Sequence, residues 1–429
     1  MSLFIDLYEL TMAQVYFNEK RDAKAVFNFF VREDGKRNYY IFSGLSDLLC
    51  FLEDFRFDSR EIEYLEALGK FEEPFLRYLE EFRFRGDLWA LAEGEVFFAN
   101  EPVVQVEGSL IETQIIETAL INILQLPIMS TTKALRCKSV AKDTLLVDFG
   151  ARRAQSMEAA DIVARSCVIG GFAATSNLEA AKRYSLKPVG TMAHSFVLSY
   201  ESEAEAFRAF ARHYPKDTIF LVDTFDTLEG VKRVIELAKE GVFVKGIRLD
   251  SGDVVELAKK SRQMFDRAGL KDVKIFVSGG VDEYMIRDAL EAGAPVDAWG
   301  VGTKLAVSAD EPYLDCAYKL VEVDGVPKMK FSTSKVTLPG KKRLYRKNGE
   351  KIEDTITLFD ESCEGEELLH LWMRDGRICK ELPPLEDISK KAQKALEILP
   401  KQLLDIDRHV NFEPKLSQEL QRLLAAMTP

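Results

Sequence analysis

The stretch Gly246-Ile247-Arg248-Leu249-Asp250-Ser251-Gly252-Asp253 joins a short apolar run to a cluster of charged residues and glycine. A stretch with helical spacing of its apolar residues, Val254–Ala268, begins directly after it. Strand, polar turn and helix follow one another in this order in parallel α/β proteins, which place functional side chains after the carboxyl ends of their strands. The stretch therefore predicts one βα unit of such a fold. Alternate residues of a strand share a face, so Arg248 and Asp250 should point to the same side.

The same order of strand, polar turn and helix recurs between Leu145 and Trp299 and predicts the architecture of the central part of the chain. The expected strands are short apolar runs, namely Leu145–Val147, Val168–Ile169, Ile219–Val222, Val244–Ile247, Lys274–Val277 and Ala298–Trp299. Helical patterns that follow them include Leu228–Lys239 and Glu283–Glu291. Six such units predict an α/β fold with a parallel sheet. An irregular (β/α) barrel is favoured because polar residues follow nearly every strand, whereas an open sheet concentrates its site at one point.

The segments before and after this βα region have other patterns. A mixed α+β N-terminal domain is expected over 1–140, where helical and strand-like runs are combined, and the barrel with the catalytic loops over 141–329. The segment 330–380 has hairpin signals such as Asn348-Gly349 and is a candidate to complete the N-terminal domain. The polar, helical stretch 380–429 is expected to form a C-terminal tail.

The overall composition limits the classes of partner. The chain has 429 residues and a formal net charge of -12, which argues against nucleic-acid binding because that needs a basic surface. No apolar run reaches the length of a membrane span and no targeting signal is recognised, so we expect no membrane partner. The six scattered cysteines are typical of reduced thiols in a cytoplasm. Cys363, His370 and Cys379 match no common zinc spacing, so no metal site is expected.

Two glycine-containing segments follow the last expected strands and suit an anion. They are Ser278-Gly279-Gly280 and Gly300-Val301-Gly302-Thr303. Glycine lets backbone N–H groups approach a phosphate closely, and phosphate sites in barrels commonly follow the last strands. The alternative is two ordinary turns between strand and helix. Together with His194, one of only four histidines, in the segment Gly190–Ser195, these segments predict a phosphate-handling enzyme with a reactive histidine.

At these motifs and others the chain resembles nicotinate phosphoribosyltransferases, from Asp6 to about Arg346. The matching motifs are Asp6–Gln14, Phe29–Arg32, Asn100–Pro102, Asp148–Arg153, Ile169–Phe172, Thr175–Asn177, the segments around His194 and Asp250, and both glycine-containing segments. The resemblance implies a mixed N-terminal domain packed on an irregular α/β barrel, and a homodimer whose active sites use residues from both subunits. It implies transfer of phosphoribose from phosphoribosyl pyrophosphate to nicotinate, coupled to hydrolysis of ATP with Mg²⁺.

The resemblance also assigns the chemistry to residues that follow the strands. His194 matches the histidine that the family phosphorylates from ATP. A neutral imidazole accepts a phosphoryl group when its other nitrogen is held by a hydrogen-bond acceptor, for which we expect Asp223 or Asp226. Asp250 is suited to bind the ribose hydroxyls or to stabilise positive charge in the transition state, and Arg248 to contact nicotinate or phosphate. The alternatives are a structural histidine and a buried Arg–Asp pair.

The nicotinate ring is expected to lie against Phe149, which offers an aromatic face, and Arg152, which can pair bidentately with its carboxylate. Tyr8 matches a tyrosine that the partner subunit contributes in the family. Ser176 stands where related nicotinamide enzymes carry an aspartate. Because an aspartate would repel a carboxylate substrate, a neutral serine favours nicotinate. For Phe149 alone, core packing is the alternative.

Three basic residues, Arg32, Lys330 and Lys335, are candidates for binding pyrophosphate. The segment Lys330–Arg346 is rich in Lys and Arg within an otherwise acidic chain. Its stretch Lys335–Lys341 resembles the Lys-Pro-Gly-Lys loop of the family. The alternative is a solvated basic loop without a ligand.

Other functions remain open. The chain could be a nicotinamide or quinolinate phosphoribosyltransferase, although Ser176 argues against the first and the ATP-linked His194 segment against the second. A non-catalytic metabolite-binding relative is disfavoured because the reactive residues and both glycine-containing segments are present. A barrel lyase with a Schiff-base lysine would use Lys245 or Lys304, which lie near strand ends.

Overall fold

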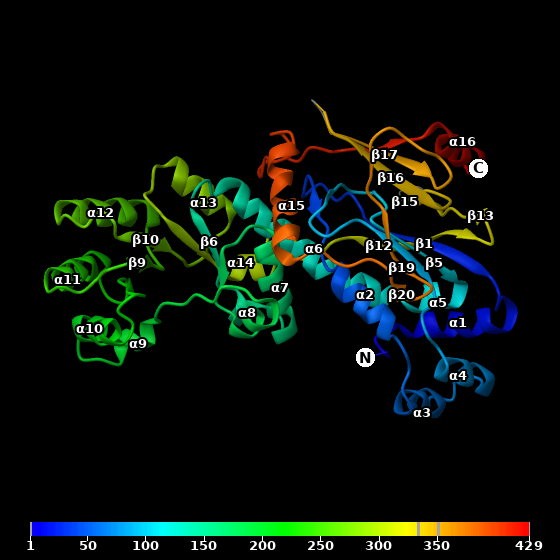
Figure 1. Cartoon of the computed structure of the whole chain (residues 1–429), viewed down its shortest axis with the longest axis horizontal. Helices are drawn as coiled ribbons and strands as arrows, with labels where there is room; N and C mark the ends of the chain where they lie inside the picture. The colour runs from blue at the N-terminus through cyan, green and yellow to red at the C-terminus, as the bar shows by residue number, and fades with distance from the viewer. Residues whose placement is uncertain (1, 333–334, 350–351, 429) are drawn as a thin grey trace. The chain divides into compact units, whose positions relative to one another are not determined.

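The computed structural model describes residues 2–332, 335–349 and 352–428. Contacts between Cα atoms divide the chain into two compact units. Unit 1 comprises Met1–Met129 with Tyr313–Pro429, and unit 2 comprises Ser130–Pro312. Each unit has its own sheets (Figure 1).

Unit 2 is built on a six-stranded parallel sheet with the order β7-β6-β11-β10-β9-β8. The strands are β6 (Leu145–Asp148), β7 (Ala174–Thr175), β8 (Ile219–Leu221), β9 (Gly246–Leu249), β10 (Lys274–Val277) and β11 (Ala298–Val301). The helical elements are η1 (Ala151–Arg153), α7 (Met157–Ile169), α8 (Leu178–Tyr184), α9 (His194–Leu198), α10 (Glu203–His213), α11 (Thr227–Lys239), α12 (Val254–Arg267), α13 (Glu283–Glu291) and α14 (Thr303–Ala306). Helices α11 and α12 pack side by side (Figure 1), and α12 packs on β9 and β10.

These elements confirm the expected α/β fold with a parallel sheet of six strands, whose barrel is irregular. The segment Lys187–Val189 runs beside β7, because Thr175 N donates to Lys187 O (3.1 Å) and Val189 N donates to Thr175 O (2.9 Å). Among the described residues no ladder joins this edge to β8. One expected strand is wrong, since Val168–Ile169 forms the last turn of α7. The true strand, β7, has only two residues and is too short to stand out in the sequence.

Aspartate caps explain why three helices begin directly after the strand-end loops. The carboxylates of Asp226, Asp253 and Asp282 accept hydrogen bonds from backbone N–H groups in the first turns of α11, α12 and α13. Such caps satisfy backbone donors that have no partner within the helix. The loops after β8, β9 and β10 are therefore short and anchored.

Unit 1 contains an antiparallel seven-stranded sheet with the order β13-β12-β1-β5-β3-β19-β20 and a four-stranded sheet with the order β18-β16-β17-β21. The first holds β1 (Lys24–Val31), β3 (Asp87–Ala90), β5 (Val104–Ser109), β12 (Cys316–Val323), β13 (Val326–Pro327), β19 (His370–Arg374) and β20 (Arg377–Ile378). The second holds β16 (Lys342–Lys347), β17 (Glu353–Leu358), β18 (Glu366–Glu367) and β21 (Lys415–Leu416). Two short pairs are β2 (Tyr40–Ile41) with β4 (Val96–Phe97), and β14 (Phe331–Ser332) with β15 (Lys335–Val336).

The helices of unit 1 are α1 (Leu7–Glu19), α2 (Leu45–Asp54), α3 (Ser59–Ala67), α4 (Glu73–Glu80), α5 (Leu110–Ile115), α15 (Leu385–Ile398) and α16 (Gln418–Met427). The long helix α6 (Glu117–Val140) begins in unit 1 and continues into unit 2. A cluster of buried apolar side chains, among them Phe29, Phe75 and Trp372, forms the core of this unit. None of the helices formed by the described residues is long and apolar enough to cross a membrane.

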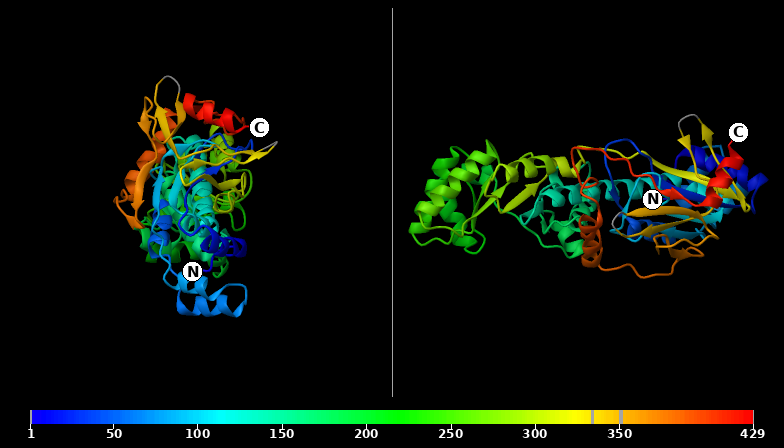
Figure 2. Two further views of the ribbon diagram at one scale, coloured as in Figure 1. Left: turned by 90° about the vertical axis from the view of Figure 1, so that its right-hand side faces the viewer. Right: turned by 90° about the horizontal axis from the view of Figure 1, so that it is seen from above.

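The contacts group some residues differently from the expected domain boundaries, which stay a prediction. Strand β12 pairs with β1 from Ala25↔Val323 to Val31↔Cys316, so residues 313–329 lie with unit 1 and not with the barrel. In the tail, β21 pairs with β17 and α16 packs beside β17 (Figure 2). Residues 380–429 therefore share the sheets of unit 1 instead of standing apart.

Candidate active site

A cavity of about 530 Å³ opens at the carboxyl ends of the strands of unit 2. Its wall is formed by loops that follow β6, β7, β9, β10 and β11, and by the segment before α9. It brings together the expected site residues Phe149, Arg152, Ser176, Arg248, Asp250, Ser278, Gly279, Gly280, Gly300, Gly302 and Thr303. Residues spread over 155 positions of sequence thus meet because parallel strands end at one edge of the sheet.

Arg248 in β9 and Asp250, which directly follows this strand, lie side by side, as their alternation predicts. Arg248 Nη2 lies 3.6 Å from Asp250 Oδ1, and Ser278 donates a hydrogen bond to the same carboxylate. Arg248 Nη1 donates to Thr191 Oγ1 (2.6 Å) and to Met192 O (3.1 Å). The arginine therefore ties the segment that leads to His194 to the floor of the cavity.

The electrostatics of Arg248 leave capacity for a ligand. Burial lowers the pKa of Arg248 and Arg152 lowers it further, while Asp250 and Asp223 act in the opposite direction. Its Nε is buried and has no hydrogen-bond partner in the described part of the chain. A buried donor of this kind is costly unless something binds it.

His194 is the first residue of α9 and lies beside this cavity. Its Nδ1 is 3.1 Å from Thr224 Oγ1, and its Nε2 is 4.0 Å from Asp250 Oδ2. The expected partner of the ring, Asp223 or Asp226, is wrong: the partner is Thr224, which follows β8. Asp226 instead caps α11 by accepting from Glu229 N (2.9 Å).

Asp223 holds the loop that carries Asp250. Its Oδ2 accepts hydrogen bonds from Asp250 N (2.9 Å) and Ser251 Oγ (2.7 Å). Its Oδ1 is buried with no hydrogen-bond partner in the described residues. The Asp223 side chain therefore holds the loop Asp250–Ser251, whereas the His194 ring bonds to Thr224.

Phe149 follows β6 and forms one wall of the cavity. Its ring packs edge-on against Phe276, with centroids 5.4 Å apart at 88°, and the Arg248 guanidinium lies 5.9 Å from its centre. Asp148, which sequence reasoning did not assign, fixes this loop by accepting from Gly150 N (2.7 Å) and Thr175 Oγ1 (2.6 Å). Burial raises the pKa of Asp148, and these two hydrogen bonds oppose the rise.

Arg152, Arg153 and Ser176 are the exposed polar residues of the same side of the cavity. Ser176 N donates to Asp148 O (2.8 Å), which fixes its position after β7. Within the described residues neither Arg152 nor Arg153 forms an ion pair. Two uncompensated guanidinium groups in a partly enclosed cavity favour an anionic ligand.

In the two segments that are expected to bind phosphate, close packing against neighbouring loops also requires glycine. Gly279 has φ +87°, and a Cβ there would lie 2.0 Å from Asp250 O. A Cβ on Gly300 would lie 2.7 Å from the Phe149 ring, and one on Gly302 would lie 3.1 Å from Phe149 O. These glycines thus let neighbouring loops approach closely. The sequence predicted phosphate binding for them but not this packing role.

The remaining expected site residues belong to unit 1. Tyr8 is exposed on α1, and burial of part of its ring, with the carboxylates of Glu117 and Glu9, raises its pKa. Arg32 Nη1 pairs with Asp315 Oδ1 at 2.7 Å, so its charge is already partly compensated. Lys330 is exposed, whereas the side chain of Lys335 lies outside the described residues.

The two candidate Schiff-base lysines have structural partners. Lys245 Nζ lies 2.9 Å from Asp217 Oδ1 before the start of β9, away from the carboxyl ends of the strands. Lys304 Nζ lies 2.5 Å from Asp282 Oδ2. An ion-paired ammonium is a poor nucleophile, so this arrangement favours phosphate chemistry over a lyase.

A parallel α/β barrel with a cationic, glycine-lined cavity and a histidine beside it defines an enzyme for an anionic, phosphate-bearing substrate. Residues 3–125 match the nicotinate phosphoribosyltransferase N-terminal domain, and residues 144–352 match the nicotinate phosphoribosyltransferase family. The chain therefore belongs to the nicotinate phosphoribosyltransferase family and is an enzyme of this type.

Individual relatives agree with this assignment. A nicotinate phosphoribosyltransferase of Mycobacterium tuberculosis is 46% identical over 413 residues, covering 95% of this chain and 89% of the relative. One from Bacillus subtilis is 38% identical, covering 98% of this chain and 93% of the relative. The crystal structure of human nicotinic acid phosphoribosyltransferase has a TM-score of 0.88 at 26% identity and covers 99% of both chains.

Proposed function

We propose that this cavity transfers phosphoribose from phosphoribosyl pyrophosphate to nicotinate. The observation that carries the proposal is the position of Arg152, a guanidinium without an ion pair among the described residues, in one cavity with Phe149 and both glycine-containing segments. A guanidinium pairs with the nicotinate carboxylate while the aromatic ring packs against the pyridine. Ser176 adds no charge that would repel this carboxylate, which favours nicotinate over nicotinamide.

Asp250 is proposed to stabilise the ribosyl group during transfer. The bond between ribose C1 and the pyrophosphate oxygen breaks, the pyridine nitrogen forms the new bond to C1, and pyrophosphate leaves. Positive charge develops on the ribose in between, and a carboxylate held by Ser278 and Arg248 is preorganised to stabilise it. The turns at Gly279–Gly280 and Gly302–Thr303 are proposed to hold the 5-phosphate.

His194 is proposed to accept the γ-phosphoryl group of ATP on Nε2. When Nδ1–H donates to Thr224 Oγ1, Nε2 carries the lone pair and faces the cavity side of Asp250. The bond from the γ-phosphorus to ADP breaks as the bond to Nε2 forms, and water later releases phosphate. Mg²⁺ is proposed to arrive with the phosphates of ATP and phosphoribosyl pyrophosphate, because it usually needs only one or two protein carboxylates.

We further propose that the enzyme acts in a cytoplasm as a homodimer that shares its active sites. Support comes from helix α1, on which Leu7, Tyr8 and Val15 are exposed. Exposed apolar side chains on one helix are suited to contact a second copy. Tyr8 of the partner subunit would then cover the nicotinate ring, and Arg32, Lys330 and Lys335 would contact pyrophosphate.

A product assay tests the proposal. The full chain is incubated with phosphoribosyl pyrophosphate and either nicotinate, nicotinamide or quinolinate, with and without Mg-ATP, and the mononucleotide is quantified. We expect product from nicotinate and a higher yield with ATP. Product from nicotinamide or quinolinate alone would contradict the proposal. With γ-labelled ATP, an acid-labile label should appear on the wild type and be absent from His194→Asn.

A further inference from the structure

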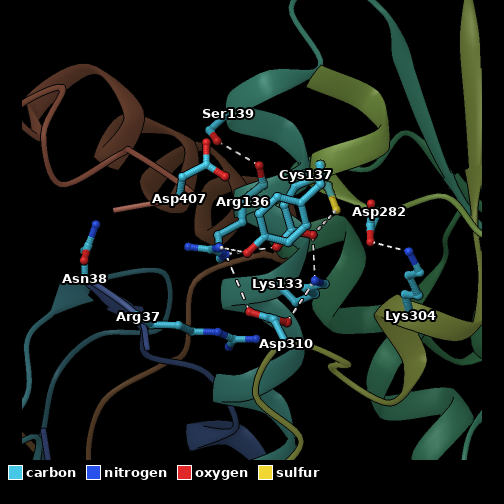
Figure 3. A network of polar contacts seen from close by, with 12 residues as sticks. Arg37, Asn38, Lys133, Arg136, Cys137, Ser139, Asp282, Lys304, Asp310 and Asp407 are labelled. Atoms are coloured by element: carbon cyan, nitrogen blue, oxygen red, sulfur yellow. Dashed lines mark hydrogen bonds and ion pairs between the residues drawn. The ribbon is translucent and has the colours of Figure 1, made fainter. Parts of the chain in front are cut away.

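Outside the cavity, unit 2 contains a largely buried cluster of four charged side chains, which we name the α6 charge cluster: Lys133, Arg136, Glu283 and Asp310. Figure 3 labels Lys133, Arg136 and Asp310. Lys133 Nζ lies 2.6 Å from Glu283 Oε2 and 2.8 Å from Asp310 Oδ1. Arg136 Nε lies 3.1 Å from Glu283 Oε1 and 3.7 Å from Asp310 Oδ2. The side chain of Glu283 is completely buried and that of Lys133 is 1% exposed.

Two of these four side chains are cations and two are carboxylates. Burial lowers the pKa of Lys133, but Glu283 and Asp310 outweigh it, so that its pKa is raised and the ammonium stays charged. Buried ion pairs contribute little to stability compared with apolar packing, but removing one partner of such a pair leaves a buried charge without it. We therefore ask which segments of the chain the α6 charge cluster holds in fixed relative positions.

The four side chains join helix α6 to the two segments that follow the glycine turns of the cavity. Glu283 is three residues after Gly280 and begins α13. Asp310 lies in the turns that continue α14, where Ala309 N donates to Lys304 O (2.9 Å). A second contact joins these segments directly, since Lys304 Nζ lies 2.5 Å from Asp282 Oδ2 (Figure 3).

We propose that Glu283 is a positioning residue, which holds both phosphate turns in register through the α6 charge cluster without touching the substrate. The proposal rests on the proposed function, because it assumes that these turns bind the 5-phosphate. Glu283 does not line the cavity, so its effect must pass through the backbone of Gly279–Gly280 and, by way of Lys133 and Asp310, of Gly302–Thr303. It should act on the phosphorylated substrate and spare nicotinate.

The first test is Glu283→Gln, which keeps the shape and removes the charge. We expect the KM for phosphoribosyl pyrophosphate to rise about tenfold, with the KM for nicotinate and the labelling of His194 by ATP almost unchanged. The matched control is Asp354→Asn, which breaks the buried pair of Arg346 and Asp354 in unit 1. An equal rise in the phosphoribosyl pyrophosphate KM in this control, at a similar loss of melting temperature, would overturn the proposal.

A double variant separates positioning from stability. Lys133→Met with Glu283→Gln removes both partners of one buried ion pair, so the melting temperature should recover relative to Glu283→Gln while the KM for phosphoribosyl pyrophosphate stays raised. Recovery of both would show that the cluster acts only through stability, against the proposal. A third variant, Lys304→Met, removes a charge that is partly exposed to solvent. We expect it to raise the same KM about threefold at an unchanged melting temperature, and an unchanged KM would count against the proposal.

Failure of the inference and failure of the proposed function are distinguishable. Calorimetric titration of phosphoribosyl pyrophosphate into the full chain measures its binding without turnover. If the wild type forms no nicotinate mononucleotide, the proposed function fails. If the wild type forms product but Glu283→Gln binds phosphoribosyl pyrophosphate as the wild type does, only the positioning role of Glu283 fails.

Discussion

The two ends of the barrel in unit 2 are built from the same strands but treat charge in opposite ways. At the carboxyl end, the cavity of about 530 Å³ is lined by Arg152 and Arg153, which form no ion pair with the described residues. At the amino end, a second cavity of about 400 Å³ is lined mainly by apolar side chains. Two lysines on its rim are compensated, since Lys245 and Lys274 each lie 2.9 Å from an aspartate, Asp217 and Asp297 respectively.

This difference indicates that charges at the amino end serve stability, whereas charges at the carboxyl end are available to a ligand. At the amino end, the ion pairs of Lys245 and Lys274 reduce the field that these two lysines offer to a ligand. Unpaired guanidinium groups in a partly enclosed cavity keep their attraction for an anion. Matched substitutions at the two ends should therefore have very different effects on catalysis.

The largest effect is expected for the carboxylate at the carboxyl end. Asp250→Asn keeps an acceptor for Ser278 but removes the negative charge that would stabilise the ribosyl transition state, so kcat should fall about 10²- to 10³-fold. Steady-state kinetics with nicotinate as substrate measure it. The control is Asp297→Asn at the amino end, which breaks the pair with Lys274. A comparable fall in kcat in the control would break the comparison.

A smaller effect is expected for the cation that is proposed to bind nicotinate. Arg152→Met removes one charge-assisted pair, worth roughly 1.5–3 kcal/mol, so the KM for nicotinate should rise about tenfold to a hundredfold. The KM for phosphoribosyl pyrophosphate should change much less. Lys274→Met at the amino end is the matched control and should leave both constants unchanged. If Arg152→Met leaves the KM for nicotinate unchanged, the carboxylate binds elsewhere.

The partner of the histidine should have a moderate effect. Thr224→Val removes the hydrogen bond to His194 Nδ1 and keeps the size of the side chain. A lost neutral hydrogen bond is worth about 0.5–1.5 kcal/mol, so phosphorylation of His194 should slow about two- to tenfold. The rate of labelling from γ-labelled ATP measures it, and ATP-independent formation of mononucleotide should be unaffected. Labelling at the wild-type rate would mean that Thr224 does not set the tautomer.

The smallest effect concerns a carboxylate behind the catalytic loops. Burial raises the pKa of Glu203 to about 7, although Arg233 opposes the rise. Unfolding returns it to about 4.5, so the unfolded chain loses the proton first, and stability falls as the pH rises from 4.5 to 7 and is level above. Glu203→Gln should flatten this decline, by at most about 3 kcal/mol. Thermal unfolding at pH 5 and pH 8 measures it, and an equal decline in both proteins would contradict the assigned pKa.

Much of the barrel could be predicted because its strands and helices have strong periodic signals. The helix Glu283–Glu291 was expected with the bounds that the structure has, and β6 and β10 lie within a residue of their expected ends. Strand β7 was missed because it has two residues, and the pairing of β12 with β1 was missed because they are 285 residues apart at Val31 and Cys316. Long-range pairing leaves no local trace in composition or spacing.

The sequence predicted which residues line the cavity better than it predicted which of them contact one another. Arg248, Asp250 and the glycine turns meet in one cavity because a parallel sheet brings its strand ends together. The partner of His194 was not predictable, since Asp223, Thr224 and Asp226 all follow β8 and their side-chain directions depend on the turn. The α6 charge cluster was not foreseen either, because Lys133 and Glu283 are far apart in the sequence and ordinary in type.

The close approach of Gly279 to the backbone of Asp250 has a consequence for how this family can diverge. A Cβ at position 279 would meet a backbone oxygen at 2.0 Å, which no change of the Asp250 side chain can relieve. Position 279 should therefore remain glycine in any descendant that keeps this loop closure, whether or not it still binds a phosphate. Invariance at that position would mark inheritance of a backbone shape, and retention of the activity would have to be judged from the residues proposed to carry it, Arg152, His194 and Asp250.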